Sequence, residues 1–292
     1  MKRVWISFAC GMLAVLGPGV AAANGLPPIV VDGPRNVAAE YSIYWRGFRV
    51  AGGDVKVALD TPDYKINGRF ETKGILRLLV KGVSDGESAG TVDEDWRLTP
   101  DYFRTRSVWK GDRYGRDVAF DDAGRGDDAI FIRPEDYEPL EREPVPDALR
   151  QGLDPLSLMI HASLRPWVAG PDGRPQVLAD GEIFSTFDGQ SSWTYDMRCE
   201  DEPVQVKKKS RTVYVGPAYL CDIQVEQTGG FPTERAESER RIESTGREPK
   251  ITIWFARMGD PAIMLPVKLH ARLAKRKVKI YLANLENGQG PL

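Results

Sequence analysis

The sequence predicts a mainly β protein, built from antiparallel strands around one clear helix. Apolar and polar residues alternate along about twelve short runs, which is the period-two pattern of half-buried strands. One segment, at about 154–165, has its apolar residues at helical spacing instead. No repeat of fixed period and no linker between two cores occurs, so we expect a single β-rich domain over residues 40–292.

Residues 1–23 have the pattern of a secretory signal peptide. Lys2 and Arg3 precede an apolar run that is short for a bilayer span, and small residues lead to a predicted cleavage site after Ala23. An uncleaved anchor, or a lipid attached at Cys10, fits these residues less well. Residues 24–39 follow as an extended segment. We therefore expect a periplasmic protein with no transmembrane segment after cleavage.

Composition and charge indicate an ordinary globular protein. Hydrophobic residues make up 41% of the chain and charged residues 28%, which excludes a disordered chain. Loss of the signal removes Lys2 and Arg3, so the net charge changes from −2 to about −4. This charge gives no whole-protein attraction to nucleic acid, and we expect no nucleic-acid partner.

The strand pattern starts at Tyr41. Residues 41–72 predict an antiparallel meander, in which Gly52 and Gly53 mark a bend. Residues 75–83 fit one or two turns of helix better than a strand, and strand patterns resume at Thr91. The proline-rich, acidic stretch 133–147 predicts an exposed connection.

The clearest helix begins at Asp154. Asp154 stands where an N-cap belongs, and Pro155 takes the first helical position, where its missing N–H costs nothing. His161 lies inside this helix, where a lone histidine is more often a packing residue than a catalyst. The apolar stripe consists of Leu156, Met159, Ile160, Ser163 and Leu164.

Strand patterns return over 181–199 and 211–231. The run "VKKKSR" lies between them, and we interpret its four charges as a solvated loop. The charged segment 233–249 predicts a mobile insertion or a long exposed hairpin. The chain closes with a hairpin over 262–285, where lysines on the outer face are typical of an edge strand.

Two cysteines, Cys199 and Cys221, remain in the mature chain. Both lie on apolar strand faces, and an even pair in an exported protein predicts a disulfide between neighbouring strands. Two free buried thiols are the alternative. Neither histidine, His161 or His270, lies near a cysteine, so we expect no metal site and no cofactor.

Four stretches, in this order, resemble an exported bacterial family known as domain of unknown function 3108: "YSIYWRGFRVAGG", "DPLSLMIHASLR", "FDGQSSWTYDM" and "LPVKLHARLAKRKVKIYL". The resemblance extends from about Glu40 to Leu282. It implies a curved antiparallel sheet, or half-open β-barrel, wrapped around the helix at about 154–165, similar to the periplasmic lipoprotein carriers. It implies no established activity and carries over no functional residues. The charged segment 233–249 matches no feature of the family.

No catalytic motif is present, and we expect no enzyme. Neither histidine accompanies a nucleophile elbow, and phosphate-binding and dinucleotide motifs are missing from the sequence. The family's shape and the export signal favour a binder of an apolar or amphipathic ligand, such as a lipid. A partner protein or glycan of the cell envelope is the alternative ligand, and a carboxylate-based hydrolase is the third reading. Candidate lining residues, for each of which core packing is the alternative, are Trp45, Phe70, Leu156, Met159, Ile160, Trp193, Tyr195 and Met197.

Overall fold

A computed structural model describes residues 35–286, apart from 75, 169–174, 180, 209–210, 234–249, 259–262 and 274–275. The predicted signal peptide, residues 24–34 and nearly all of the charged segment 233–249 lie outside the described residues. The strands are β1 Arg35–Trp45, β2 Phe48–Asp60, β3 Asp63–Thr72, β4 Gly82–Val92, β5 Leu98–Trp109, β6 Asp112–Ala119, β7 Ile130–Ile132, β8 Glu182–Phe187, β9 Ser192–Cys199, β10 Val204–Val206, β11 Gly216–Gly229, β12 Lys250–Met258, β13 Ile263–Leu273 and β14 Arg276–Glu286. The helices are α1 Leu76–Leu79, α2 Ser157–Leu164 and α3 Gln176–Ala179, with 3-10 turns η1 Asp147–Leu149 and η2 Arg165–Trp167.

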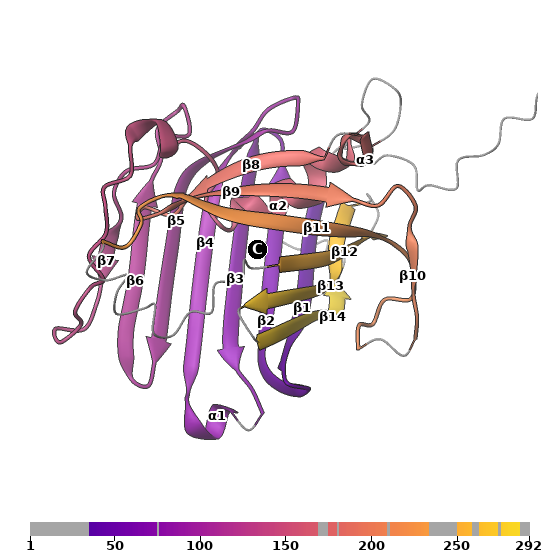
Figure 1. Cartoon of the computed structure of the whole chain (residues 1–292), viewed down its shortest axis with the longest axis horizontal. Coiled ribbons are helices and arrows are strands. Elements are labelled where there is room, and N and C mark those ends of the chain that lie inside the picture. Colours follow the sequence, from indigo (N-terminus) through magenta and orange to yellow (C-terminus); the bar gives the residue numbers. More distant parts are fainter. Residues whose placement is uncertain are drawn as a thin grey trace, which may run out of the picture.

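The strands form one antiparallel sheet, as the sequence predicts. The strand order is β7-β6-β5-β4-β3-β2-β1-β14-β13-β12-β11-β9-β8, and β10 pairs with β11 beside this path. The first and last strands of the chain therefore pair with each other at the centre of the sheet. In Figure 1 the sheet curves back on itself, so that β8, β9 and β11 cross in front of β3 to β6, with α2 between them. This curved sheet around one longer helix confirms the predicted fold class.

The two free edges of the sheet are β7 and β8. Among the described residues no strand pairing joins these edges, and loops connect them instead. The segment around Leu153 bridges the gap: Leu153 pairs with Thr186 of β8, and Gln151 pairs with Arg125 after β6. Arg116 of β6 donates to the backbone oxygen of Asp188 at 3.0 Å and lies 2.5 Å from its carboxylate. Strand pairing therefore does not close the barrel, but two isolated bridges, a hydrogen bond and an ion pair connect its two edges.

Replacing Arg116 by methionine is expected to lower the free energy of unfolding by about 1 kcal/mol, since both partners are largely buried but still partly screened. Urea unfolding at neutral pH measures this. Arg113→Met on the exposed part of the same strand is the control. An equal loss in both variants would show that the link across the edges contributes nothing.

Strand β4 corrects the prediction that residues 75–83 form helix and that strand resumes only at Thr91. The helix is limited to α1, and β4 already begins at Gly82. Its sequence, "GVSDGESAGTV", lacks apolar alternation because its inner face holds small residues beneath α2. A Cβ atom on Gly86 would lie 3.1 Å from Leu156 of the helix segment, and one on Gly90 would collide with the oxygen of Thr99.

Strand β14 corrects a second prediction. Lys277 and Lys279 lie on a strand that pairs with β13 on one side and β1 on the other. The strand is therefore central, and its lysines do not protect an edge.

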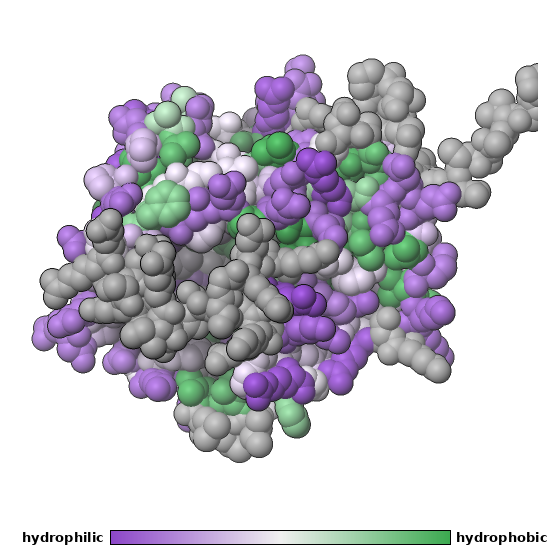
Figure 2. Space-filling view, in the orientation of Figure 1, coloured by the Kyte–Doolittle hydropathy of each residue, from purple (hydrophilic) through white to green (hydrophobic). Residues whose placement is uncertain are grey.

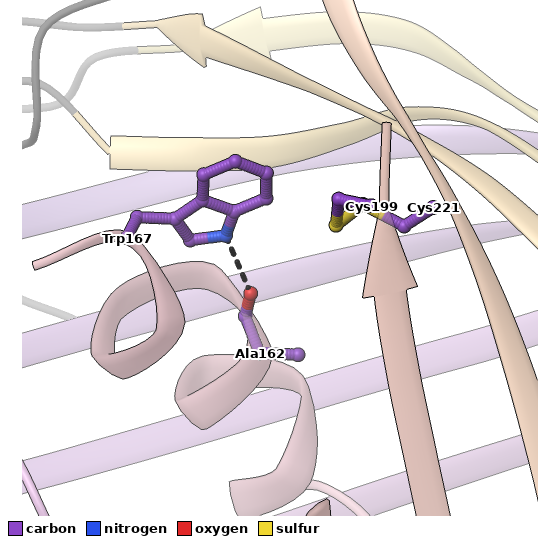
Figure 3. The surroundings of a disulfide bond; sticks show 4 residues. All are labelled: Ala162, Trp167, Cys199 and Cys221. Carbon is purple, nitrogen blue, oxygen red and sulfur yellow. Dashed lines mark hydrogen bonds between the residues drawn. A yellow bond between two sulfur atoms is a disulfide. The ribbon is translucent and has the colours of Figure 1, made fainter. Parts of the chain in front are cut away.

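The predicted disulfide joins Cys199 of β9 to Cys221 of β11. The two residues are directly opposite in the antiparallel ladder, so the bond crosslinks neighbouring strands. Cys221 is fully buried. Figure 3 shows the bond beside Trp167, whose indole N–H donates to the backbone oxygen of Ala162 at 3.0 Å. The ring of Trp167 lies 5.2 Å from that of Tyr219 and 5.5 Å from that of Phe255, so η2 is fixed against β11 and β12.

Candidate functional site

A cavity of about 210 Å³ lies between α2 and the inner face of the curved sheet. Its walls come from both halves of the sheet, which α2 separates. The residues that line it are Val37, Ala39 and Tyr41 of β1, Val55 and Val57 of β2, Ile66 of β3, Leu158, Met159, Ile160, Ala162 and Ser163 of α2, Phe184, Tyr195 and Ile223 of β8, β9 and β11, Ile251, Ile253 and Phe255 of β12, and Ile263, Leu265, Pro266 and Leu269 of β13.

The lining is almost wholly apolar. No charged side chain among the described residues lines it, and its polar side chains are Tyr41, Tyr195 and Ser163. The hydroxyl of Ser163 already donates to the backbone oxygen of Met159 at 2.9 Å. Burial raises the pKa of Tyr41 and of Tyr195, so both phenols stay protonated at neutral pH. A charged group would lose its hydration here without a partner, whereas an apolar group would not.

A buried polar network fixes the start of α2 against the sheet. Asp154 is fully buried, and its Oδ1 accepts the backbone N–H groups of Leu156 at 2.8 Å and Ser157 at 3.1 Å. Its Oδ2 accepts the hydroxyl of Ser88 on β4 at 2.7 Å, together with that of Ser157. The hydroxyl of Tyr64 on β3 lies 2.6 Å from that of Ser157. Asp154 is therefore the predicted N-cap, and it also ties the helix to β4, while Ser157 ties it to β3.

Of the eight predicted lining residues, Met159, Ile160 and Tyr195 line the cavity. The other five lie elsewhere. Trp45 is the last residue of β1, with the guanidinium of Arg46 over its ring at 5.0 Å. Trp193 lies at the start of β9, opposite Thr186 and Gln227.

Phe70, Leu156 and Met197 are packing residues. The ring of Phe70 lies against the backbone of Gly53, and Leu156 packs over Gly68 and Gly86. Met197 is fully buried. Ile253 and Phe255 of β12 also line the cavity and were not predicted to do so. The alternation of apolar residues along "KITIWFARM" was a usable signal for them.

His161 lies on α2 but does not line the cavity. Its ring is buried, packs edge-on against Phe184 at 5.5 Å, and has its Nε2 3.7 Å from the carboxylate of Glu182. His270 lies on the other face of the sheet, on β13. In the described part of the chain no group of three His, Cys, Asp or Glu side chains could hold a metal ion.

A second depression, of about 670 Å³, lies on the charged face of β2 to β5. Two of its three carboxylates are paired with bases: Arg69 lies 2.7 Å from Asp85, and Lys65 lies 3.2 Å from Glu87. The hydrogen bond that Tyr102 donates lowers the pKa of Glu87. A general acid of a glycosidase needs the opposite shift.

Fold and cavity together define an open, barrel-like antiparallel β protein with an apolar space between its sheet and its helix. The chain belongs to the family described as "Protein of unknown function (DUF3108)", whose model matches residues 40–283. It is also similar to a solved structure from Brucella abortus, titled a beta-barrel-like protein of domain of unknown function DUF1849. The identity is 12%, the TM-score is 0.47, and the match covers 88% of this chain and 99% of the other. A comparison with curated proteins gives no match. No helix of the described residues is long and apolar enough to cross a bilayer.

Proposed function

We propose that this protein is an exported, non-catalytic binder of an apolar or amphipathic ligand, such as a lipid, in the bacterial cell envelope. The apolar cavity between α2 and the sheet carries this proposal, because its lining offers dispersion contacts and three hydroxyls but no charge. An engineered cavity of about 150 Å³ with a comparable lining stays dry and binds small apolar molecules. The disulfide supports the periplasmic location, since such bonds persist in oxidising compartments.

The chemistry of the cavity supports binding over catalysis. Its phenols are protonated, its serine is satisfied by the helix backbone, and His161 is not among its lining residues. An amphipathic ligand would place its hydrocarbon part here and keep a charged headgroup outside. Tyr41 and Tyr195 can each donate one hydrogen bond to an uncharged polar atom of the ligand.

Filling the cavity is expected to weaken the binding of such a ligand. Ala39 is buried in β1 and lines the cavity, so Ala39→Phe places a ring in the space that the ligand needs. The Kd of a fluorescent fatty acid should rise about tenfold or more, which corresponds to roughly 1.4 kcal/mol or more of binding free energy. Ala119→Phe, on an exposed position of β6, is the matched control and should bind as the wild type does.

Native mass spectrometry of the protein, purified without detergent, completes the test. A discrete added mass that organic extraction releases as lipid, and that Ala39→Phe lacks, would identify the ligand class. A bare mass together with no saturable binding of the fluorescent fatty acid would overturn the proposal.

A further inference from the structure

The outer face of β12, β13, β14 and β1 carries a continuous row of aromatic and basic side chains. Lys268 lies over the ring of Trp254 at 3.7 Å, and that ring is 5.0 Å from His270. The row continues across β14, where Tyr281 lies 6.0 Å from His270 and 5.6 Å from Tyr44. Trp254 and His270 point away from the cavity, since their strand neighbours Ile253 and Leu269 line it.

The charge of this face is mostly positive. The sequence stretches 41–53, 206–219, 250–258 and 263–285 contain lysines and arginines and not one Asp or Glu. Acids on or beside these strands include Glu40 of β1, Glu286 of β14 and Asp222 of β11, whose carboxylate accepts the hydroxyl of Thr252 on β12 at 2.7 Å. Among the described residues no ion pair involves Lys268, Lys277 or Lys279. The chain as a whole has a net charge of −2, so the positive charge is concentrated on one side.

The lowered pKa values of His270 and Lys268 agree with a concentration of positive charge on this face. Burial, followed by the charges of Lys268, Lys279 and Lys277, lowers the pKa of His270 to about 4. Burial, followed by the charge of Lys279, lowers the pKa of Lys268. A nearby anion would relieve the repulsion between these groups.

Exposed apolar side chains project beside these cations. Phe48 is 67% exposed, and Val213 and Val215 are each 58% exposed. Arg46 and Gly47 both have positive φ, so a tight two-residue turn holds Phe48 at the tip of the β1–β2 hairpin.

The loop between β10 and β11 lies beside that tip. Arg211 donates to the backbone oxygen of Gly47 at 3.0 Å and covers the ring of Tyr44 at 4.4 Å. The N–H of Val213 donates to the oxygen of Leu282 on β14 at 3.0 Å. Figure 2 shows hydrophobic atoms among hydrophilic ones over β10, at the right of the view.

We propose that this face, formed by Phe48, Val213 and Val215 with the row from Trp254 to Tyr44 and its lysines, docks the protein on an anionic phospholipid surface. Three apolar side chains on two neighbouring loops can enter the headgroup layer of a bilayer, while the surrounding cations attract anionic headgroups. The half-buried rings of Trp254 and Tyr44 suit the same boundary, because such rings are apolar at one end and polar at the other.

The proposal also explains the lysines of β14, which lie on a central strand and not at an edge of the sheet. Lys207 and Lys208 of the run "VKKKSR" are then part of the docking face, because they are exposed and follow β10 directly. An acidic protein partner fits less well, because protein interfaces usually pack a central apolar core, whereas here the apolar residues project from loops. The docking face is independent of whether the cavity holds a ligand.

Sedimentation with vesicles tests this, using residues 24–292 and two lipid mixtures, pure phosphatidylcholine and phosphatidylcholine with phosphatidylglycerol. We expect binding to the anionic vesicles only, weakened by salt. Phe48→Ser should weaken it by roughly tenfold, and Lys279→Ala by about fivefold. Ile130→Ser, which alters a 72% exposed residue on β7, should leave it unchanged.

Phe48 is exposed, so the variant is expected to fold, and an unchanged melting temperature verifies this. No binding to anionic vesicles at low salt would overturn the proposal and direct the search to an acidic protein partner. Binding that Phe48→Ser and Ile130→Ser weaken equally would overturn the assignment to this face. A bare cavity in native mass spectrometry would leave the vesicle result as it stands, so the two proposals fail separately.

Discussion

Asp154→Ala is expected to lower the free energy of unfolding by about 3 kcal/mol, which is among the largest effects of any single substitution outside the apolar core. The change removes the N-cap of α2 and leaves the hydroxyls of Ser88 and Ser157 without their common acceptor. Both hydroxyls are fully buried, so water cannot replace the carboxylate without a rearrangement. Urea unfolding, followed by tryptophan fluorescence, measures the loss.

Asp93→Ala is the matched control. The carboxylate of Asp93 also accepts two backbone N–H groups, those of Asp95 and Arg97, but it lies in an exposed turn where water can take its place. We expect a loss of less than about 1 kcal/mol there. Equal losses in the two variants would mean that local capping explains the effect of Asp154 and that its ties to the sheet contribute nothing.

The pH dependence of the same site has a definite sign. Burial raises the pKa of Asp154 in the folded protein above its ordinary value. Between the two pKa values the folded state binds the proton more tightly than the unfolded state does, so stability falls as pH rises from about 4 toward the folded pKa. Asp154→Asn cannot titrate. The stability of the wild type relative to this variant should therefore be greatest in acid and decrease as pH rises.

Unfolding curves of both proteins, taken at steps from about pH 4 to pH 8, give this difference directly, because the other carboxylates cancel. A difference that increases with pH would show that the hydrogen bonds to Asp154 outweigh its burial. In that case the carboxylate is the form that the site stabilises.

The contrast between Asp154 and β4 shows which parts of the fold local sequence determines. The start of α2 could be predicted, because capping by Asp154 and the conformation of Pro155 are local effects. β4 could not, because Gly86 is small to admit Leu156, which is 70 residues away in the chain. Likewise, alternation in β14 predicts a strand but not its neighbours, so its lysines were assigned to an edge that does not exist.

The cavity shows the same limit at the level of single side chains. Tyr195 and Met197 are two residues apart on one face of β9, and periodicity treats them alike. Tyr195 lines the cavity, whereas Met197 is fully buried in the core. The difference depends on which distant elements pack over each residue, and no period in the sequence contains that information.

Replacing both cysteines by alanine is expected to destabilise the protein by roughly 3 kcal/mol, because the disulfide closes a loop of 22 residues in the unfolded chain. The melting temperature should fall by roughly 6–12 °C. Differential scanning calorimetry of the variant, and of wild-type protein with and without a thiol reductant, provides the measurement. The reductant should lower the melting temperature of the wild type and leave that of the variant unchanged.

Because of where the disulfide lies, this experiment tests how far the bond restricts the unfolded chain. Cys199 and Cys221 already face each other across the β9–β11 ladder, and the backbone pairs on either side of them do not depend on the sulfur atoms. The disulfide therefore adds little to the native contacts and acts chiefly by restricting the unfolded chain. An unchanged melting temperature, with unfolding still cooperative, would mean that residues 199–221 stay close in the unfolded chain without the bond. The disulfide would then mark the compartment in which the protein folds, and the β9–β11 pairing alone would hold that wall of the cavity.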